Sequence, residues 1–425
     1  MNYKKRITDS LLDEKLQSFG GVLIVGPKGC GKTTSAKQFA KSFIELQDEE
    51  KRDMYIATAE TAPSKLLIGA KPRLIDEWQD IPKLWGCVRK SIDDEQNVGL
   101  YILTGSSSKD VKTPHTGTMR ISSMMMYPMS LYESGESNGE VSLIDLFNNK
   151  EYDGCVSNLT IDDLIYAICR GGWPTHFKVT NPKYKLNIAK DLYYQTCHKD
   201  INAIDGVERN PLFAENIMKS YARNICTLSS KTTVFKDTLT NTEMSENTFK
   251  DYLSALEKLY IITDIDAWCP AIRSQSAIRA SKKRNFIDPS IAVAALGLSP
   301  EYFNLDFKTL GFLFECLCIR DLKIYSSKYG GRVSYYHDRY GLEADCVLHL
   351  EDGRYAIIEF KLGGSGIEEG AKHLCEIERL VKEFNEKEKQ CKLRLPDLKI
   401  VITGGEYGYK RKDGVLVIPI GCLKD

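Results

Sequence analysis

The sequence lacks several features that would assign it to a class at once. Lys and Arg together number 58, and Asp and Glu also number 58, so no net charge draws the whole molecule toward nucleic acid or a membrane. No apolar run approaches the roughly 20 residues that span a bilayer, and we expect no membrane partner. The opening segment MNYKKRITDSLLDEKLQS is polar and contains no apolar core of a signal peptide. These absences favour a cytoplasmic protein whose anion sites are local arrangements.

The cysteines and histidines also lack the spacings of metal sites. Thirteen cysteines is an odd number, and they are scattered without a CxxC pair. Because several lie in apolar runs, we expect reduced, buried thiols and no metal ligand among them. The six histidines show no ligand spacing, and His115, near Arg120, is the one that merits a test. Four of the cysteines in apolar runs are Cys169, Cys316, Cys318 and Cys346.

The order of the predicted elements indicates an α/β chain of several domains. A chain of 425 residues suggests two to four domains at roughly 150 residues each. The first part alternates the short strands GVLIVG, DMYIAT, PRLIDE and GLYILTG with helices such as 33–46, typical of a parallel sheet covered by helices. Helical patterns follow, then a strand-like LYIITDIDAW that suggests a winged helix, and finally helix, three strands, helix and two strands. We predict domains at 1–135, 136–208 (helical and lid-like), 209–300 (winged-helix-like) and 301–425.

A phosphate-binding loop lies between the first strand and the first helix of that pattern. Residues 26–33 read GPKGCGKT and match GxxxxGK[ST] in the strand–loop–helix context that the motif requires. Glycines let successive backbone N–H groups point at a phosphate, and the helix N-terminus adds positive potential. We expect Lys32 to reach the β- and γ-phosphates of ATP and the Thr33 hydroxyl to coordinate Mg²⁺. The predicted nucleotide-binding residues here are Gly26, Pro27, Lys28, Gly29, Cys30, Gly31, Lys32, Thr33 and Thr34.

Two acidic residues follow a later strand of the same region. The sequence Arg73-Leu-Ile-Asp76-Glu77 delivers two carboxylates at a strand end. We expect Asp76 to hold Mg²⁺ and Glu77 to act as the general base on the attacking water. Two solvated carboxylates would give the same pattern, but the phosphate loop upstream favours the catalytic interpretation.

Further polar residues are candidates for contacts with the γ-phosphate. Thr104 and Ser106 end the strand YILTG and either contact the phosphate or form a plain turn. Arg120 is either an arginine finger acting in trans from a neighbouring subunit, worth about 10³–10⁵ in rate, or a surface ion pair. Arg170, before GGWP, is a weaker candidate for the same role, and Trp173 is expected to pack.

These motifs, in this order, resemble the prokaryotic AAA-type ATPases that carry a C-terminal domain of unknown function. The resemblance rests on GPKGCGKT, LIDEWQDIP, YILTGSS, HTGTMR leading into YPMSLYESG, and GGWP. It implies an ASCE-type P-loop core in which Lys32, Thr33, Asp76 and Glu77 have their usual roles. It also implies a winged-helix segment before the C-terminal domain.

A second carboxylate constellation lies in the C-terminal region. Asp345 and Glu359-Phe-Lys361 fall on two successive strands that a tight turn would join into a hairpin, and Glu315 lies on the preceding helix. We expect Asp345 and Glu359 to hold Mg²⁺, Lys361 to orient water, and Glu315 to complete the metal shell. The D-x13-ExK spacing and the element order resemble the PD-(D/E)XK nuclease core, the restriction-endonuclease-like fold. Such a core either cleaves phosphodiesters or serves only as a binding platform.

A run of cations between the two sites suggests a DNA contact, although a solvated face gives the same pattern. The cations are Arg273, Arg279, Lys282, Lys283 and Arg284, and they adjoin the predicted helix 247–258. We therefore predict an ATPase, with ATP and Mg²⁺ as cofactors, coupled to a nuclease-like domain that acts on or binds DNA. The alternative is a nucleotide-switched interaction protein, oligomeric through Arg120, whose nuclease-like domain is not catalytic.

Overall fold

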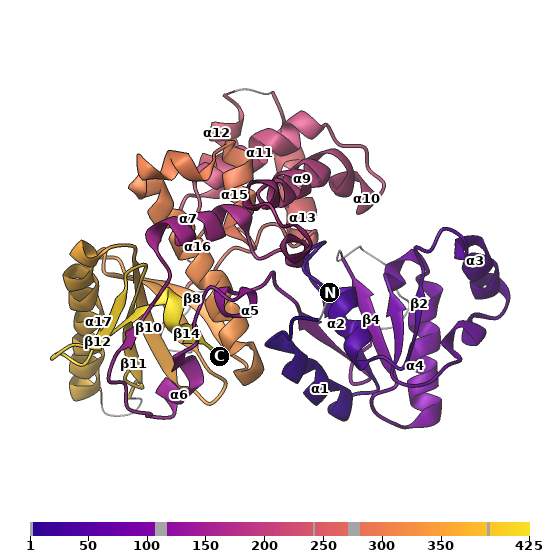
Figure 1. The fold of residues 1–425 in the computed structure, drawn as a ribbon, viewed down its shortest axis with the longest axis horizontal. Coiled ribbons are helices and arrows are strands. Elements are labelled where there is room, and N and C mark those ends of the chain that lie inside the picture. Colours follow the sequence, from indigo (N-terminus) through magenta and orange to yellow (C-terminus); the bar gives the residue numbers. More distant parts are fainter. Residues whose placement is uncertain (1–2, 107–116, 241–242, 271–280, 389–391) are drawn as a thin grey trace.

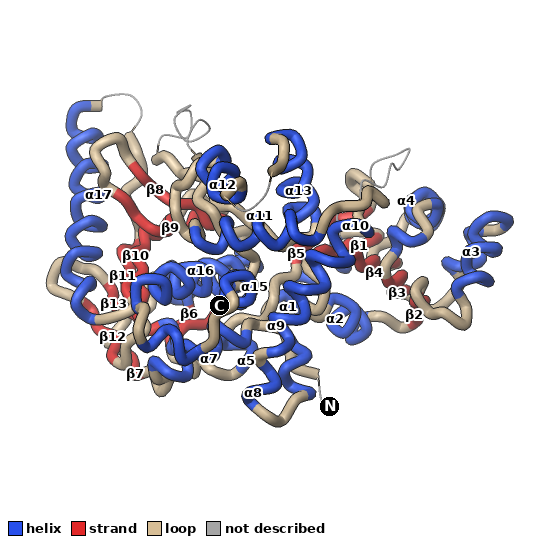
Figure 2. Tube along the Cα trace, turned by 90° about the horizontal axis from the view of Figure 1, so that it is seen from above, coloured by secondary structure: helices blue, strands red, loops and turns tan. Residues whose placement is uncertain are grey.

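The computed structural model describes residues 3–106, 117–240, 243–270, 281–388 and 392–425. Two β-sheets lie at opposite ends of the molecule, and a helical region joins them (Figure 1). Seen from above, the helices of the middle region extend from one sheet to the other (Figure 2). The α/β fold class predicted from the sequence is confirmed. None of the helices within the described ranges is long and apolar enough to cross a membrane.

The amino-terminal sheet is parallel throughout and has the order β2-β3-β4-β1-β5. Its buried strands carry Val22, Ile24, Leu74 and Ile102 on one core face. β4 separates the strand that precedes the phosphate loop from the strand that ends in Asp76. The strands are β1 Gly21–Val25, β2 Ser42–Glu45, β3 Arg73–Asp76, β4 Tyr101–Gly105 and β5 Ile121–Met125. The helices are α1 Thr8–Ser18, α2 Lys32–Phe39, α3 Arg52–Thr61 and α4 Lys83–Glu95.

Two secondary-structure predictions in this region were wrong. The segment DMYIAT lies in α3, where Tyr55 and Ala59 are buried four residues apart, as on one face of a helix. The predicted helix 33–46 ends at Phe39, and its last part forms the edge strand β2. A short apolar run does not distinguish strand from helix by itself.

The middle region is helical and is centred on the apolar helix α15. Most side chains of α15 are buried, and α15 packs against α7, α9 and α11. After α11, α12 and α13, antiparallel bridges join Ile262 to Phe286 and Ile265 to Lys283. The winged-helix assignment of this part stays a prediction. The helices are α5 Leu131–Ser134, α6 Leu143–Phe147, α7 Ile161–Arg170, α8 Pro182–Lys185, α9 Asn187–Gln195, α10 Ile201–Ala203, α11 Pro211–Arg223, α12 Lys231–Thr238, α13 Glu246–Lys258 and α15 Pro289–Leu296.

The carboxy-terminal sheet is mixed and has the order β7-β12-β13-β11-β10-β9-β8. Helices α16 and α17 cover opposite faces, because neighbouring residues of β10 belong to different cores: Ile358 joins the core with α16, and Ile357 the core with α17. The helices are α16 Phe307–Ser326 and α17 Ile367–Lys387. The strands are β7 Cys155–Val156, β8 Arg332–His337, β9 Glu343–His349, β10 Tyr355–Lys361, β11 Leu398–Thr403, β12 Tyr407–Lys410 and β13 Leu416–Pro419.

Residues 141–156 also belong to this end of the molecule. β7 pairs with β12, and β6 (Val141–Ser142) pairs with β14 (Leu423–Lys424). The domain boundaries drawn from the sequence stay a proposal, and they did not include this return of the chain to the carboxy-terminal sheet. The short strand β12 was not predicted, since Tyr407–Lys410 is polar and largely exposed.

Candidate functional site

The phosphate loop connects β1 to α2 through three glycines with left-handed backbone. Gly26, Gly29 and Gly31 have φ values of 151°, 77° and 106°. A Cβ atom on Gly26 would lie 2.2 Å from the carbonyl oxygen of Met126, so no side chain fits there. The glycines thus give the bend that the motif requires, and α2 begins at Lys32, directly after it. A cradle that side chains would fill, next to a helix N-terminus, fits a bound phosphate.

Lys32, Thr33 and Asp76 meet at the carboxyl ends of β1 and β3. The Lys32 ammonium donates to the carbonyl oxygens of Gly26 and Pro27, each at 2.9 Å. The Thr33 hydroxyl donates to Asp76 Oδ1 at 2.7 Å. Burial raises the pKa of Asp76, and its hydrogen bonds with Thr104 and Thr33 oppose the rise. A hydroxyl beside a carboxylate is a set of hard oxygen donors that fits Mg²⁺.

Glu77 has an unusual backbone conformation and a firmly held side chain. Its φ of 52° lies in the left-handed region, which is strained for glutamate and often found at functional sites. Its carboxylate accepts from the Ser106 hydroxyl at 2.9 Å, from the Ser106 N–H at 3.2 Å and from Gln79. Its N–H donates to Thr104 Oγ1 at 3.1 Å. Thr104 is fully buried and also donates to Asp76, so its hydroxyl positions the two acids rather than lining the cavity.

A cavity of about 690 Å³ opens beside these groups. Lys32, Thr33, Glu77 and Ser106 line it, together with Pro174, Thr175, Phe177, Lys178 and the amino-terminal Tyr3, Lys4 and Arg6. These amino-terminal residues were not predicted from the sequence, because no motif marks them.

Among these amino-terminal residues, Arg6 is fixed by several contacts. It is buried, pairs with Glu133 at 3.0 Å and donates to the carbonyl oxygens of Cys30 and Tyr127, both at 2.9 Å. Arg6 therefore connects the amino-terminal segment, the phosphate loop and the segment after β5. The only sequence signal is a charged residue just before the amphipathic pattern of α1.

The phosphate loop also contacts the helical region. Lys28 forms an ion pair at 2.6 Å with Asp200, which ends the helical segment Thr196–Asp200 that follows α9. A second cavity of about 620 Å³ lies next to this pair and is lined by Trp173 and by α9. Lys28 also lines the cavity at the phosphate loop, so its predicted contact with nucleotide stays a prediction. Trp173 is buried, as predicted, and donates to Ser290 Oγ at 3.0 Å.

Neither candidate arginine finger lines the cavity at the phosphate loop of its own chain. The Arg120 carbonyl accepts from Gly21, at the start of β1, whereas the phosphate loop follows the other end of that strand. The Arg120 side chain pairs with Asp93 at 2.8 Å. Its role in trans stays a prediction. Arg170 is buried and forms an ion pair with Glu136, so we interpret it as a structural residue and no longer as a candidate arginine finger. His115 lies outside the described residues.

The carboxy-terminal candidates converge as the hairpin prediction requires. β9 and β10 are antiparallel, and Phe360 N–H donates to Asp345 Oδ2 at 2.9 Å. Lys361 pairs with Glu359 at 2.8 Å. Burial, with the charge of Asp345, raises the pKa of Glu359 to about 8. Its Oε1 atom is buried without a hydrogen-bond partner among the described residues, and His373 Nδ1 lies 3.7 Å away.

Glu315 joins this cluster through a residue that the sequence analysis placed elsewhere. Lys283 lies 2.7 Å from Glu315 Oε1 and 3.9 Å from Asp345 Oδ1, and it is 6% exposed. Burial raises the pKa of Glu315 to about 8, against the effect of Lys283. Glu315 therefore bonds an ammonium in place of the metal that we predicted for it.

The predicted cationic surface run is wrong for its two buried members. Lys283 is in the carboxylate cluster, and Arg284 is buried and paired with Asp264. Lys282 is exposed and pairs with Asp266 at 2.9 Å. Arg273 and Arg279 lie outside the described residues. Within the described part of the chain, only Lys282 of this run faces solvent.

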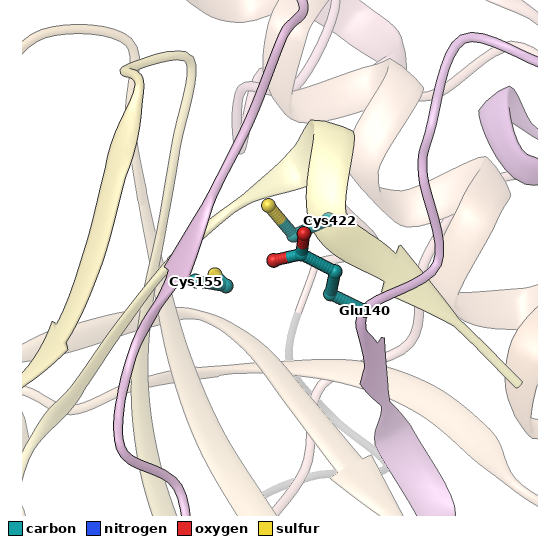
Figure 3. Close-up of side chains that lie close together, drawn as sticks. All are labelled: Glu140, Cys155 and Cys422. Carbon is teal, nitrogen blue, oxygen red and sulfur yellow. The ribbon is translucent and has the colours of Figure 1, made fainter.

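A third group of ligand-type side chains lies near the carboxyl terminus. One atom each from Glu140, Cys155 and Cys422 lies within 4.8 Å of the others (Figure 3). Hydrogen bonds with Cys422 and Tyr152 outweigh burial and lower the pKa of Cys155 to about 7. The cysteines in the described ranges form no disulfide.

Three family models match successive parts of the chain. Residues 18–135 match the model described as AAA domain, residues 161–302 match the domain of unknown function DUF8612, and residues 310–423 match the domain of unknown function DUF4143. A search of curated proteins found no match. Among solved structures, the Walker-type ATPase PABY2304 of Pyrococcus abyssi is similar, with 14% identity and a TM-score of 0.44 over 69% of this chain and 96% of its own. Residues 18–135, which contain the phosphate loop and the acids after β3, are thus similar to an AAA domain.

Proposed function

We propose that the protein binds ATP with Mg²⁺ at the phosphate loop and hydrolyses it to ADP and phosphate. One observation carries the proposal: the loop lysine, the Thr33–Asp76 pair and the Glu77 carboxylate all lie at one cavity, at the carboxyl ends of parallel strands. Ligands of open α/β sheets bind at this edge. The match of residues 18–135 to the AAA domain supports the same activity.

Each residue has a role that its contacts suit. The backbone N–H groups of the loop receive the phosphates, and Lys32 exchanges its two carbonyl partners for phosphate oxygens. Thr33 and Asp76 would hold Mg²⁺, which neutralises charge on the phosphates. Glu77 accepts a proton from the attacking water, and Ser106 holds the carboxylate of Glu77 in place.

The proposal is tested by retention of labelled ATP on the purified protein. Lys32→Ala should lose nucleotide binding, because the loop then lacks its cation. Glu77→Gln should retain ATP and hydrolyse it slowly, since only the base is removed. If Lys32→Ala retains ATP as well as the unaltered protein does, the loop is not the nucleotide site.

We infer that the carboxy-terminal region is a binding platform coupled to the ATPase, and that DNA is its first candidate partner. The helix–strand–strand–strand–helix–strand order and the convergence of Asp345, Glu359 and Lys361 support a nuclease-like core. The burial of Lys283 and Arg284 removes part of the cationic surface expected for DNA, so the platform rather than the nuclease is favoured.

The platform is tested by the ATPase rate with and without single- and double-stranded DNA. Stimulation would link the two ends of the molecule through DNA. An unchanged rate with both would direct the search to a protein partner. Mass measurement with and without ATP tests oligomerisation: an unchanged monomer would exclude a nucleotide-driven assembly through Arg120.

A further inference from the structure

The carboxy-terminal cluster contains an ammonium group where a nuclease-like site would need a divalent cation. Lys283 comes from the segment before α15, outside the region that carries the other members. Its Nζ atom bonds Glu315 at 2.7 Å and lies 3.4 Å from the carbonyl oxygen of Asp345. Both partners come from elements that the sequence assigned to metal binding.

The free oxygen of Asp345 faces this ammonium. Asp345 Oδ2 accepts from the Phe360 N–H, which leaves Oδ1 as the oxygen for a cation, and Lys283 Nζ is 3.9 Å from it. On the other side, Glu359 Oε2 is bonded to Lys361. Three carboxyl groups and two ammonium groups thus share one buried cluster. Formally, removal of one ammonium raises the negative charge of the cluster from one to two, which a dication would balance.

Lys283 is fixed in place by its backbone as well as by its side chain. Its N–H donates to the Ile265 carbonyl at 2.9 Å, and its own carbonyl accepts from the Ile265 N–H at 2.9 Å. The next residue, Arg284, is anchored by Asp264 and by the carbonyl oxygen of Ser229. The backbone therefore holds Lys283 where its buried side chain reaches the cluster.

We propose that Lys283 replaces the divalent cation of this nuclease-like site, so that the cluster binds no metal until Lys283 is removed. Like charges at this distance in a buried site repel strongly, and a dication beside Asp345 would meet the Lys283 ammonium. The proposal concerns the carboxy-terminal cluster alone and holds whether or not the phosphate loop hydrolyses ATP.

The test is Mn²⁺ binding to the full chain without nucleotide, measured by calorimetry and by Mn²⁺ resonance. All variants carry Asp76→Asn, so that the phosphate loop site does not contribute. With Lys283 present we expect no site that depends on Asp345. Lys283→Met should create one site that binds Mn²⁺ at least about tenfold more tightly than any residual binding by the parent. A further Asp345→Asn should abolish this site. Lys282→Met is the matched control and should behave like the parent.

Two outcomes would overturn the proposal. One is Mn²⁺ binding by protein that retains Lys283, lost on Asp345→Asn; this arm needs no substitution at position 283 and so does not depend on the folding of that variant. The other is a folded Lys283→Met protein, with an unchanged thermal transition shape, that gains no site.

Discussion

The molecule has two clusters of acidic residues at strand ends, and they differ in what surrounds them. At the phosphate loop, Glu77 borders a cavity of about 690 Å³, and Asp76 is bonded to Thr33, which also lines it. Hydroxyl groups and a side-chain amide hold the two acids. In the carboxy-terminal cluster, Glu315 and Glu359 are 8% and 1% exposed and each bonds a lysine.

If Lys283 takes the place of the cation, as we propose, converging carboxylates do not by themselves make a metal site. Hydroxyl groups leave the negative charge of Asp76 available for a cation. In the carboxy-terminal cluster, by contrast, a buried ammonium neutralises the charge of the Glu315 carboxylate within the protein. We therefore expect the first arrangement to accept a ligand and the second to need none, and the variants below separate the two.

The largest expected effect is on ATP hydrolysis, which should depend on the acids at the phosphate loop and not on those of the carboxy-terminal cluster. Glu77→Gln should lower kcat by about 10²–10⁴, because a positioned general base contributes that much. Glu359→Gln should leave kcat unchanged, since its carboxylate lies in the other cluster. Steady-state phosphate release checks both. A fall of similar size in both variants would mean that the clusters act as one site.

The next effect concerns stability and compares two neighbouring lysines. Lys283→Met should lower the free energy of unfolding by about 3 kcal/mol, because it leaves Glu315 in a buried site without its partner. Lys282→Met should change it by less than about 0.5 kcal/mol, since its pair with Asp266 is exposed. Urea unfolding measures both. Equal losses would show that the carboxy-terminal cluster is not held by Lys283.

The phosphate loop and the parallel sheet were predictable because their signals are local. The glycines of 26–31, the short apolar strands and the acids after β3 each act within a few residues of the chain. The stretch DMYIAT was misassigned because only its local apolar content was considered. That content fits a strand as well as a helix, whereas the burial of Tyr55 and Ala59 on one side favours the helix.

The residues that the sequence did not reveal are those joined over long distances. Arg6 meets Glu133, and Lys283 meets Asp345, across 127 and 62 positions of the chain. A run of cations such as Lys282-Lys283-Arg284 looks uniform in sequence. Which of them are buried depends on contacts with distant residues, such as the bridge between Ile265 and Lys283.

A third effect concerns the pH dependence of stability and arises at His176, a buried neighbour of the residues that line the cavity at the phosphate loop. Burial, together with the charge of Arg170, lowers the pKa of His176 to about 4, and His176 is 2% exposed. Below about pH 6.5 this histidine binds a proton in the unfolded chain but stays neutral in the folded chain. The free energy of unfolding that is present above pH 6.5 therefore falls as the pH is lowered from about 6.5 to 4.

His176→Phe should remove part of this loss, about 1–3 kcal/mol between these two pH values. Urea unfolding at pH 7, 6, 5 and 4 gives the two slopes. Glu136 and Lys185 also face His176, so each is kept unchanged in the comparison. Parallel slopes for the variant and the unaltered protein would show that His176 does not carry the effect.

The smallest effect asks what Ser106 does at the phosphate loop. Its hydroxyl and N–H both bond Glu77 Oε2, at 2.9 and 3.2 Å, so Ser106→Ala removes one of the hydrogen bonds that position the base. Loss of one such bond costs about 1 kcal/mol, and we expect kcat to fall by about fivefold with KM for ATP unchanged. In a Glu77→Gln background the same substitution should have no further effect, because the carboxylate that it positions is gone. A rise in KM with kcat unchanged would instead mean that Ser106 contacts the γ-phosphate. The Ser106 hydroxyl would then bind the ligand at the phosphate loop directly, rather than position Glu77.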